Sequence, residues 1–186
     1  VLLYLSRKNR FIAAVAFAVT LTVGLSVQYF FERMPSYQQK RVMTFLNPEA
    51  DPLGAGYNVL QAKVAIGSGG IFGKGYLKGT QTQLNFIPEQ WTDFIFCVPG
   101  EEFGFFGASL VLILFGAFLL HGIKIGSAAK NKSASIAAIG ITAVFATHLF
   151  VNVGMSMGLM PVVGIPLPFL SYGGSALLAN MVMSGL

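Results

Sequence analysis

Residues 103–125 read FGFFGASLVLILFGAFLLHGIKI, an apolar run with no acidic residue and a single lysine near its end. About 20 apolar residues are enough for a helix to cross the hydrocarbon core of a bilayer. Similar runs occupy residues 11–31 and 136–160, and a fourth, residues 169–186, ends with the chain. Charged residues make up only 10% of the chain, against about 25% in soluble domains. The sequence therefore predicts an all-α, polytopic transmembrane helix bundle.

The positions of the basic residues predict the orientation of these spans. One cluster precedes the first run and another follows the second, and their members are Arg7, Lys8, Arg10, Lys124, Lys130 and Lys132. Both clusters face the cytoplasm in a single orientation, as the positive-inside rule requires. Residues 32–92 then form a large extracytoplasmic loop. Because the net charge of +5 follows this membrane pattern, we expect membrane lipids as partners and no nucleic acid.

The apolar runs and the charge clusters together give a predicted division of the chain into one membrane domain. The sequence begins at a valine rather than a methionine, so we expect it to be part of a larger polypeptide. The predicted segments are cytoplasmic residues 1–10, a span at 11–31, the outer loop 32–92, a span at 93–123, a cytoplasmic loop at 124–135, a span at 136–160, an outer turn at 161–170 and a truncated span at 171–186.

A carboxylate stands at the start of the second predicted span, in residues 88–96, PEQWTDFIF. A carboxylate at membrane depth is costly, so Asp93 is a candidate functional residue. The alternative is that Asp93 caps the helix that follows it. Pro99 should kink or restart that helix. Glu101 is expected on the same half of the helix surface as Asp93. There it would raise the pKa of Asp93, bind a cation, or pair with a basic residue, either a lysine of the loop or one from helices outside this chain.

The outer loop contains three segments with recognisable chemistry. Residues 57–66 have the spacing of a short amphipathic helix, lying either on the membrane interface or against other helices. Residues 67–79 are rich in glycine and include Lys74. They form either an anion-binding turn built from backbone amides or a flexible connection. The next segment, TQTQLN at residues 80–85, has the amides and hydroxyls that suit either sugar recognition or ordinary solvation.

Polar residues also interrupt the third span and the chain that follows it. His148, Asn152 and Ser156 recur every four residues, which favours interhelical hydrogen bonds over a metal site or a proton relay. Prolines then force an irregular turn ahead of SYGGS at residues 171–175. Irregular backbone near membrane depth is tolerated where it lines a cavity or is buried in protein.

Several of these stretches together resemble the SEDS family (shape, elongation, division and sporulation) of peptidoglycan glycosyltransferases, typified by RodA and FtsW. The matching stretches are DPLGAGY at 51–57, AIGSGGIFGKG at 65–75, PEQWTDFIF at 88–96, GEEFG at 100–104, NVGM at 152–155 and GIPLPFLSYGGS at 164–175. Residues 79–84, GTQTQL, resemble the elongation branch represented by RodA. The resemblance implies a fold of about ten transmembrane helices, with this chain as the C-terminal part. Pro99 departs from the family pattern.

The resemblance also implies a function. A protein of this family polymerises lipid II into glycan strands during cell elongation, and Asp93 matches the aspartate regarded as catalytic. We expect Asp93 to act as general base, and the predicted substrate-binding residues are Arg41, Lys63, Lys74, Gln83, Glu101 and Ser171. A divalent cation (Mg or Mn) is the expected cofactor, with no nucleotide, haem or flavin. The alternatives are a lipid II flippase or a scaffold for a penicillin-binding protein.

The expected partners and location follow from the same resemblance. The partners are lipid II, the nascent glycan strand, a class B penicillin-binding protein with transpeptidase activity and proteins of the elongation complex. The expected location is the bacterial cytoplasmic (inner) membrane, with the active site facing the periplasm or the cell exterior.

Overall fold

The computed structural model describes residues 10–48, 51 and 54–185. The predictions made for Arg7 and Lys8 fall outside these residues. The described residues form helices joined by turns, with no strand among them, which confirms the all-α prediction. The chain divides into two compact units, residues 1–42 and 43–186, and each is described by itself.

The first unit contains α2 (Arg10–Arg33) and most of α3 (Ser36–Leu46). Helix α2 ends just before Pro35, because the residue preceding a proline disfavours the helical conformation. The Gln39 side-chain amide donates hydrogen bonds to the carbonyl oxygens of Phe31, at 2.9 Å, and Met34, at 3.0 Å. These bonds satisfy acceptors that the end of a helix leaves unpaired.

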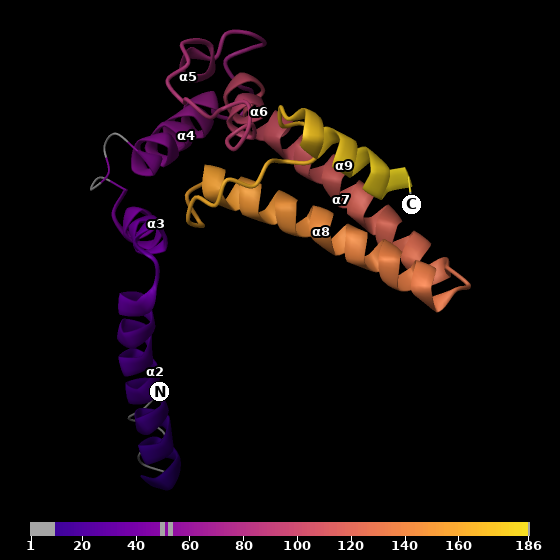
Figure 1. Ribbon diagram of the computed structural model, residues 1–186. Helices are drawn as coiled ribbons and strands as arrows, with labels where there is room; N and C mark the ends of the chain where they lie inside the picture. Colours follow the sequence, from indigo (N-terminus) through magenta and orange to yellow (C-terminus); the bar gives the residue numbers. More distant parts are fainter. Residues whose placement is uncertain (1–9, 49–50, 52–53, 186) are drawn as a thin grey trace. The chain divides into compact units, whose positions relative to one another are not determined.

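The second unit is dominated by two antiparallel helices, α7 (Gly104–Ala128) and α8 (Lys132–Ser156), shown in Figure 1. Each has 25 residues and, at about 1.5 Å per residue, is roughly 37 Å long. In the part of the chain that the structure describes, these two are the helices long and apolar enough to cross a membrane. Most of their side chains are exposed, as expected for helices that face lipid. The chain is a helical membrane protein.

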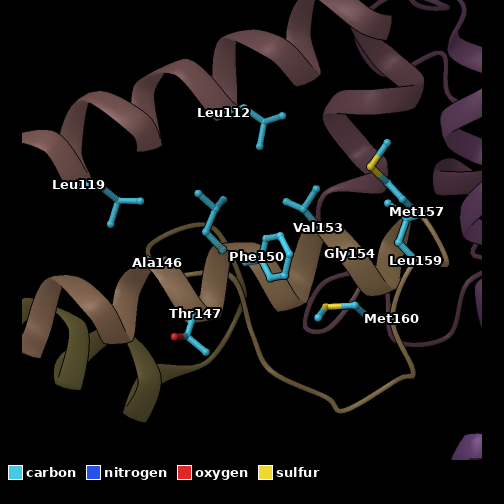
Figure 2. Close-up of a pocket in the computed structure, with 11 residues that line it drawn as sticks. Leu112, Leu119, Ala146, Thr147, Phe150, Val153, Gly154, Met157, Leu159 and Met160 are labelled. Carbon is cyan, nitrogen blue, oxygen red and sulfur yellow. The ribbon is translucent and has the colours of Figure 1, made fainter. Parts of the chain in front are cut away.

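A groove with a volume of about 710 Å³ opens between α7 and α8. Figure 2 shows Leu112 and Leu119 of α7 facing Ala146, Phe150 and Val153 of α8 across it. The groove is almost entirely apolar, so it belongs to the hydrocarbon-facing part of the helix pair.

Shorter helices gather near the start of α7: α4 (Ala55–Gly69), α5 (Thr80–Gln83) and α6 (Cys97–Glu102) (Figure 1). A buried core joins α4 to the chain around α6, and its members are Val59, Ala62, Ala65, Ile87, Phe94 and Cys97. The helix predicted over residues 57–66 therefore packs against other elements. The packing alternative left open by the sequence is therefore observed, and a position on the membrane interface stays a prediction.

The break ahead of α7 lies five residues later than the sequence predicts, at Gly104 rather than Pro99. Pro99 is the third residue of α6, where a proline is tolerated because its missing N–H would be unpaired in any case. The chain turns instead at Gly104, which has φ +64°. The amides of Phe105 and Phe106 then donate to the carbonyl oxygens of Gly70, at 2.9 Å, and Ile71, at 3.3 Å. The loop backbone thus caps the start of α7.

Residues 157–173 form an irregular segment, here called the outer hairpin, that leads from α8 to α9 (Gly174–Gly185). Phe169 anchors it, with its ring centroid 5.8 Å from that of Phe118 on α7 and 5.6 Å from that of Phe145 on α8. Leu167 is buried beside it. Phe169 has φ +63°, an unfavourable conformation that this aromatic packing offsets.

Candidate functional site

Asp93 lies in a turn before α6, and its side chain is half-buried. Its backbone amide donates to the carbonyl oxygen of Glu89 at 3.0 Å. The N-cap of α6 is Phe96, three residues further along the chain. The capping interpretation of Asp93 is therefore wrong, because the helix it was expected to cap begins too late.

Three consecutive carbonyl groups around Asp93 are held by donors from the far end of the chain. The Tyr172 amide donates to the carbonyl oxygen of Trp91 at 2.8 Å, and the Ser171 hydroxyl donates to that of Thr92 at 2.6 Å. The Asn152 side-chain amide donates to that of Asp93 at 2.9 Å. We call these three contacts the carbonyl clamp. They fix the backbone that carries the candidate catalytic carboxylate.

The donors of the clamp are themselves held in place. Asn152 is fully buried, and its amide nitrogen also donates to the carbonyl oxygen of Ile165 at 2.9 Å. The Ser171 hydroxyl accepts a hydrogen bond from the Leu167 amide at 2.7 Å. The predicted interhelical hydrogen bond is wrong for Asn152, because its partners are carbonyls of the turn at Asp93 and of the outer hairpin. Ser156 instead donates back to Asn152 within α8.

The Asp93 carboxylate lies against Gly164 of the outer hairpin. A side chain at that position would place its Cβ 3.2 Å from the Asp93 Oδ2 atom, closer than ordinary van der Waals contact. Gly164 also has φ +78°, in the left-handed region that other residues rarely adopt. The hairpin therefore makes room for the carboxylate while bringing its backbone close to it.

Glu101 and Lys74 form an ion pair that ties α6 to the outer loop. The two side chains meet at 2.7 Å, and the fully buried Glu101 carboxylate also accepts hydrogen bonds from the amides of Gln81 and Thr82, both at 2.9 Å. Burial raises the pKa of Glu101, but the hydrogen bonds from Lys74 and the two amides outweigh it and lower the pKa to about 2. Of the three roles expected for Glu101, pairing with a loop lysine is the one observed.

This pairing changes the interpretation of two predicted substrate ligands. Glu101 has no exposed surface with which to contact a substrate. The Lys74 ammonium also donates to the Thr80 hydroxyl at 2.7 Å, so its charge is directed inward. Sequence reasoning predicted both as substrate-binding residues because it could not place their side chains together. Their geometry favours a structural role that shapes the loop.

The backbone of the glycine-rich loop is also used internally. The amides of Lys74 and Gly75 donate to the carbonyl oxygens of Glu101, at 3.0 Å, and Glu102, at 2.9 Å. They therefore satisfy the last carbonyls of α6 and are not available to an anion. The expected anion-binding turn is wrong for these two amides.

The remaining predicted substrate ligands have separate locations. Lys63 is an exposed residue of α4, and its side chain lies against Gly158 of the outer hairpin. Gln83 is exposed on α5 and donates a long hydrogen bond, 3.4 Å, to Glu102. Arg41 belongs to the first unit, with its guanidinium 5.8 Å from the Tyr37 ring centroid. The roles of Lys63, Gln83 and Arg41 in substrate binding stay predictions.

Gln90 also helps to order the turn that carries Asp93, a role that was not predicted from the sequence. It is fully buried, and its side-chain amide donates to the Thr82 carbonyl at 2.9 Å and to the Asn85 side chain at 3.0 Å. These bonds join the polar segment 80–85 to the turn that carries Asp93. The sequence did not indicate this role for Gln90, because an amide side chain three residues before Asp93 is equally typical of a solvated loop.

A divalent cation finds no ready set of ligands here. Among the residues that the structure describes, no three or more histidine, cysteine, aspartate or glutamate side chains lie close enough together to hold a metal ion. The divalent cation stays a prediction, and we derive no step through it.

Comparisons with known proteins agree with this architecture. The model of the cell cycle protein family FtsW, RodA and SpoVE matches residues 1–186. The peptidoglycan glycosyltransferase MrdB of Escherichia coli K12 is 47% identical over 91% of this chain and 46% of its own length. The peptidoglycan glycosyltransferase RodA of Treponema pallidum is 49% identical over 81% of this chain and 35% of its own. The chain thus spans about half the length of the curated relatives it matches, or less.

A solved structure has a similar fold. It belongs to a study of the structural coordination of polymerization and crosslinking by a peptidoglycan synthase complex. The matching chain has a TM-score of 0.66 and is 30% identical, and the match covers 97% of this chain and 49% of that one.

Proposed function

Because this chain belongs to the FtsW, RodA and SpoVE family, we propose that it forms part of a peptidoglycan glycosyltransferase that polymerises lipid II during cell elongation. The observation that carries the proposal is the half-buried Asp93 carboxylate on a backbone fixed by the carbonyl clamp. A catalytic group must be held in a defined geometry, and the carbonyl clamp provides such a frame for Asp93.

In this reaction, Asp93 acts as the general base. The 4-hydroxyl oxygen of the acceptor sugar forms a bond to the anomeric carbon of the donor, and the hydroxyl proton passes to the Asp93 carboxylate. The bond from the anomeric carbon to the lipid diphosphate breaks, and the diphosphate leaves with the electron pair. A positioned base of this kind typically contributes about 10²–10⁴-fold to the rate.

The leaving diphosphate needs compensating positive charge rather than a second acid. Lys63 is the best-placed candidate in the second unit, because it is exposed while Lys74 is directed toward Glu101. The Lys63 side chain and the Asp93 carboxylate also lie against the same hairpin, at Gly158 and Gly164. We assign Lys63 to neutralising the diphosphate, and Arg41 is a second candidate.

The decisive experiment is Asp93→Asn in the full-length protein, tested for polymerisation of purified lipid II. We expect the rate to fall by about 10²–10⁴-fold because the base is lost. Thermal unfolding of the same variant would check that the fold is retained, since the clamp itself binds the backbone at Asp93.

The matched control is Glu89→Gln, which removes an exposed carboxylate from the same turn. It should polymerise lipid II at nearly the rate of the unmodified protein. Near-normal polymerisation by Asp93→Asn would contradict the general-base role. Movement of lipid II across a vesicle membrane without polymerisation would support a flippase instead.

The proposal extends to location and partners. The enzyme would lie in the bacterial cytoplasmic membrane with Asp93 on the outer side. It would work with a class B penicillin-binding protein and other proteins of the elongation complex. The match to a chain of a complex for polymerization and crosslinking supports this, because crosslinking is the transpeptidase reaction of such a partner. Polymerisation by the purified protein alone would exclude a purely scaffolding role.

A further inference from the structure

A cavity with a volume of about 440 Å³ lies beside the carbonyl clamp. Its lining comes from two parts of the chain: Trp91 and Ile95 flank Asp93 in sequence, and residues 169–174 belong to the outer hairpin and the start of α9. The clamp bond from the Tyr172 amide to the Trp91 carbonyl, 2.8 Å long, joins these two parts.

Two aromatic side chains stand at this cavity and remain accessible. Trp91 is 52% exposed and Tyr172 is 82% exposed, although their backbones are hydrogen-bonded to each other. The cavity lining also includes the apolar side chains of Ile95 and Leu170, and two glycines, Gly173 and Gly174, that have no side chain to cover their backbone. At Gly174 an added Cβ would meet no atom within 4 Å, so the space above it is open.

We propose that this cavity is a saccharide-binding subsite in which Trp91 and Tyr172 stack on sugar rings of the acceptor strand. A sugar ring presents an apolar C–H face and a polar rim of hydroxyl groups, which matches apolar side chains beside open backbone. Tryptophan and tyrosine combine a large apolar face with a polar group, and they have only two rotatable side-chain bonds to order on binding.

The position of the cavity near Asp93 suggests that the subsite holds the acceptor strand during the reaction. This inference rests on the proposed function. Trp91 and Asp93 are two residues apart, so their α-carbons are at most about 7 Å from each other. A sugar stacked on Trp91 therefore leaves the neighbouring sugar of the same strand within reach of the Asp93 carboxylate. The aromatic pair would hold the acceptor strand while its terminal hydroxyl reacts.

Fluorescence provides a direct test, because Trp91 is the single tryptophan of this chain. The full-length protein in lipid nanodiscs would be titrated with peptide-free glycan strands of a few disaccharide units. The signal of Trp91 is the difference between the unmodified protein and Trp91→Phe. We expect a saturable change in this difference signal as glycan is added.

Variants of Tyr172 separate stacking from other causes. Tyr172→Ala should weaken glycan binding roughly tenfold, a typical cost for losing a contacting aromatic ring, while Tyr172→Phe should bind nearly as well as the unmodified protein. Tyr76→Ala is the matched control, because Tyr76 is 70% exposed and lies elsewhere in the outer loop. In polymerisation assays, Trp91→Ala should raise the KM for the acceptor strand and leave kcat nearly unchanged.

The competing explanation is that both rings only anchor the protein in the membrane interface. Nanodiscs made with brominated lipids would then quench the Trp91 signal, and glycan strands would leave it unchanged. That result, or unaltered glycan affinity in Tyr172→Ala, would overturn the subsite. Glycan binding at Trp91 by a protein that fails to polymerise lipid II would support the subsite and contradict the proposed function, so the two failures are distinguishable.

Discussion

Gly164 has no side chain, and the Asp93 carboxylate occupies the space beside its α-carbon. We expect Gly164→Ala to lower both stability and polymerisation activity. The left-handed backbone conformation at φ +78° costs a residue with a Cβ about 1–2 kcal/mol, and the new methyl group would press on the carboxylate. Thermal unfolding and lipid II polymerisation of the full-length protein would measure the two effects.

The control for this prediction is Gly140→Ala, in the middle of α8, where an added Cβ meets no atom within 4 Å. Alanine is favoured over glycine in a helix, so this variant should unfold at an equal or higher temperature. If Gly164→Ala kept normal activity and stability, the close approach of Gly164 to Asp93 would not be needed for either.

Asn152 supplies two of the hydrogen bonds that order the site, to the carbonyls of Asp93 and Ile165. Asn152→Leu keeps a similar volume but leaves both part-buried carbonyls without this donor. We expect a loss of about 1–3 kcal/mol in the free energy of unfolding and a lower kcat, since Asp93 would no longer be held. Denaturation and polymerisation assays would check this.

Thr147→Val is the matched change on the same helix. Its hydroxyl bonds only within α8, to the Ala143 carbonyl at 2.8 Å, and the residue is exposed. This variant should retain normal kcat and stability. Equal effects from the two substitutions would mean that Asn152 matters only as part of α8, not through the clamp.

At the scale of elements, the Lys74–Glu101 pair connects the outer loop, α5 and α6, and its contribution depends on pH. The pKa of Glu101 falls from 4.5 to about 2 on folding, so the carboxylate stabilises the folded state above pH 4.5. That stabilisation, about 3 kcal/mol at neutral pH, is lost as the pH falls toward 2. Glu101→Gln should therefore be less stable at neutral pH, by an amount that shrinks between these two pH values.

Thermal unfolding of both proteins across this pH range would measure the difference. Glu89→Gln is the matched control, because it removes an exposed carboxylate from the same part of the chain. A stability difference that stayed constant down to pH 2 would show that the ionised form of Glu101 is not what stabilises the connection.

At the scale of the whole molecule, the proposed orientation in the membrane can be tested by labelling. Lys78 should face outward and Lys130 the cytoplasm, and both are exposed. Cysteine introduced at Lys78 should react with a membrane-impermeant maleimide in intact cells, whereas cysteine at Lys130 should react only after the membrane is opened. The native Cys97 is buried and should stay unlabelled in both cases. The opposite labelling pattern would reverse the proposed orientation.

The sequence predicted the helical architecture and the importance of residues 88–96, because both are local properties. Apolar runs of sufficient length identify α7 and α8 without knowledge of any contact. The clamp is different: the bond from Asn152 to Asp93 joins residues 59 apart, and that from Ser171 to Thr92 joins residues 79 apart. The pairing of Lys74 with Glu101 was one of three open alternatives, since spacing along the chain does not show which way a buried carboxylate points.

The outer hairpin has a consequence for how sequences of this kind can vary in length. Ordinary surface loops accept inserted residues at small cost. Here the segment is pinned at Ile165 by Asn152, at Gly164 by the Asp93 carboxylate and at Ser171 by the Thr92 carbonyl. One inserted or deleted residue between Gly164 and Ser171 would leave at least one of these points out of register. Natural and engineered indels should therefore be excluded from this short stretch, even though much of it lies at the protein surface.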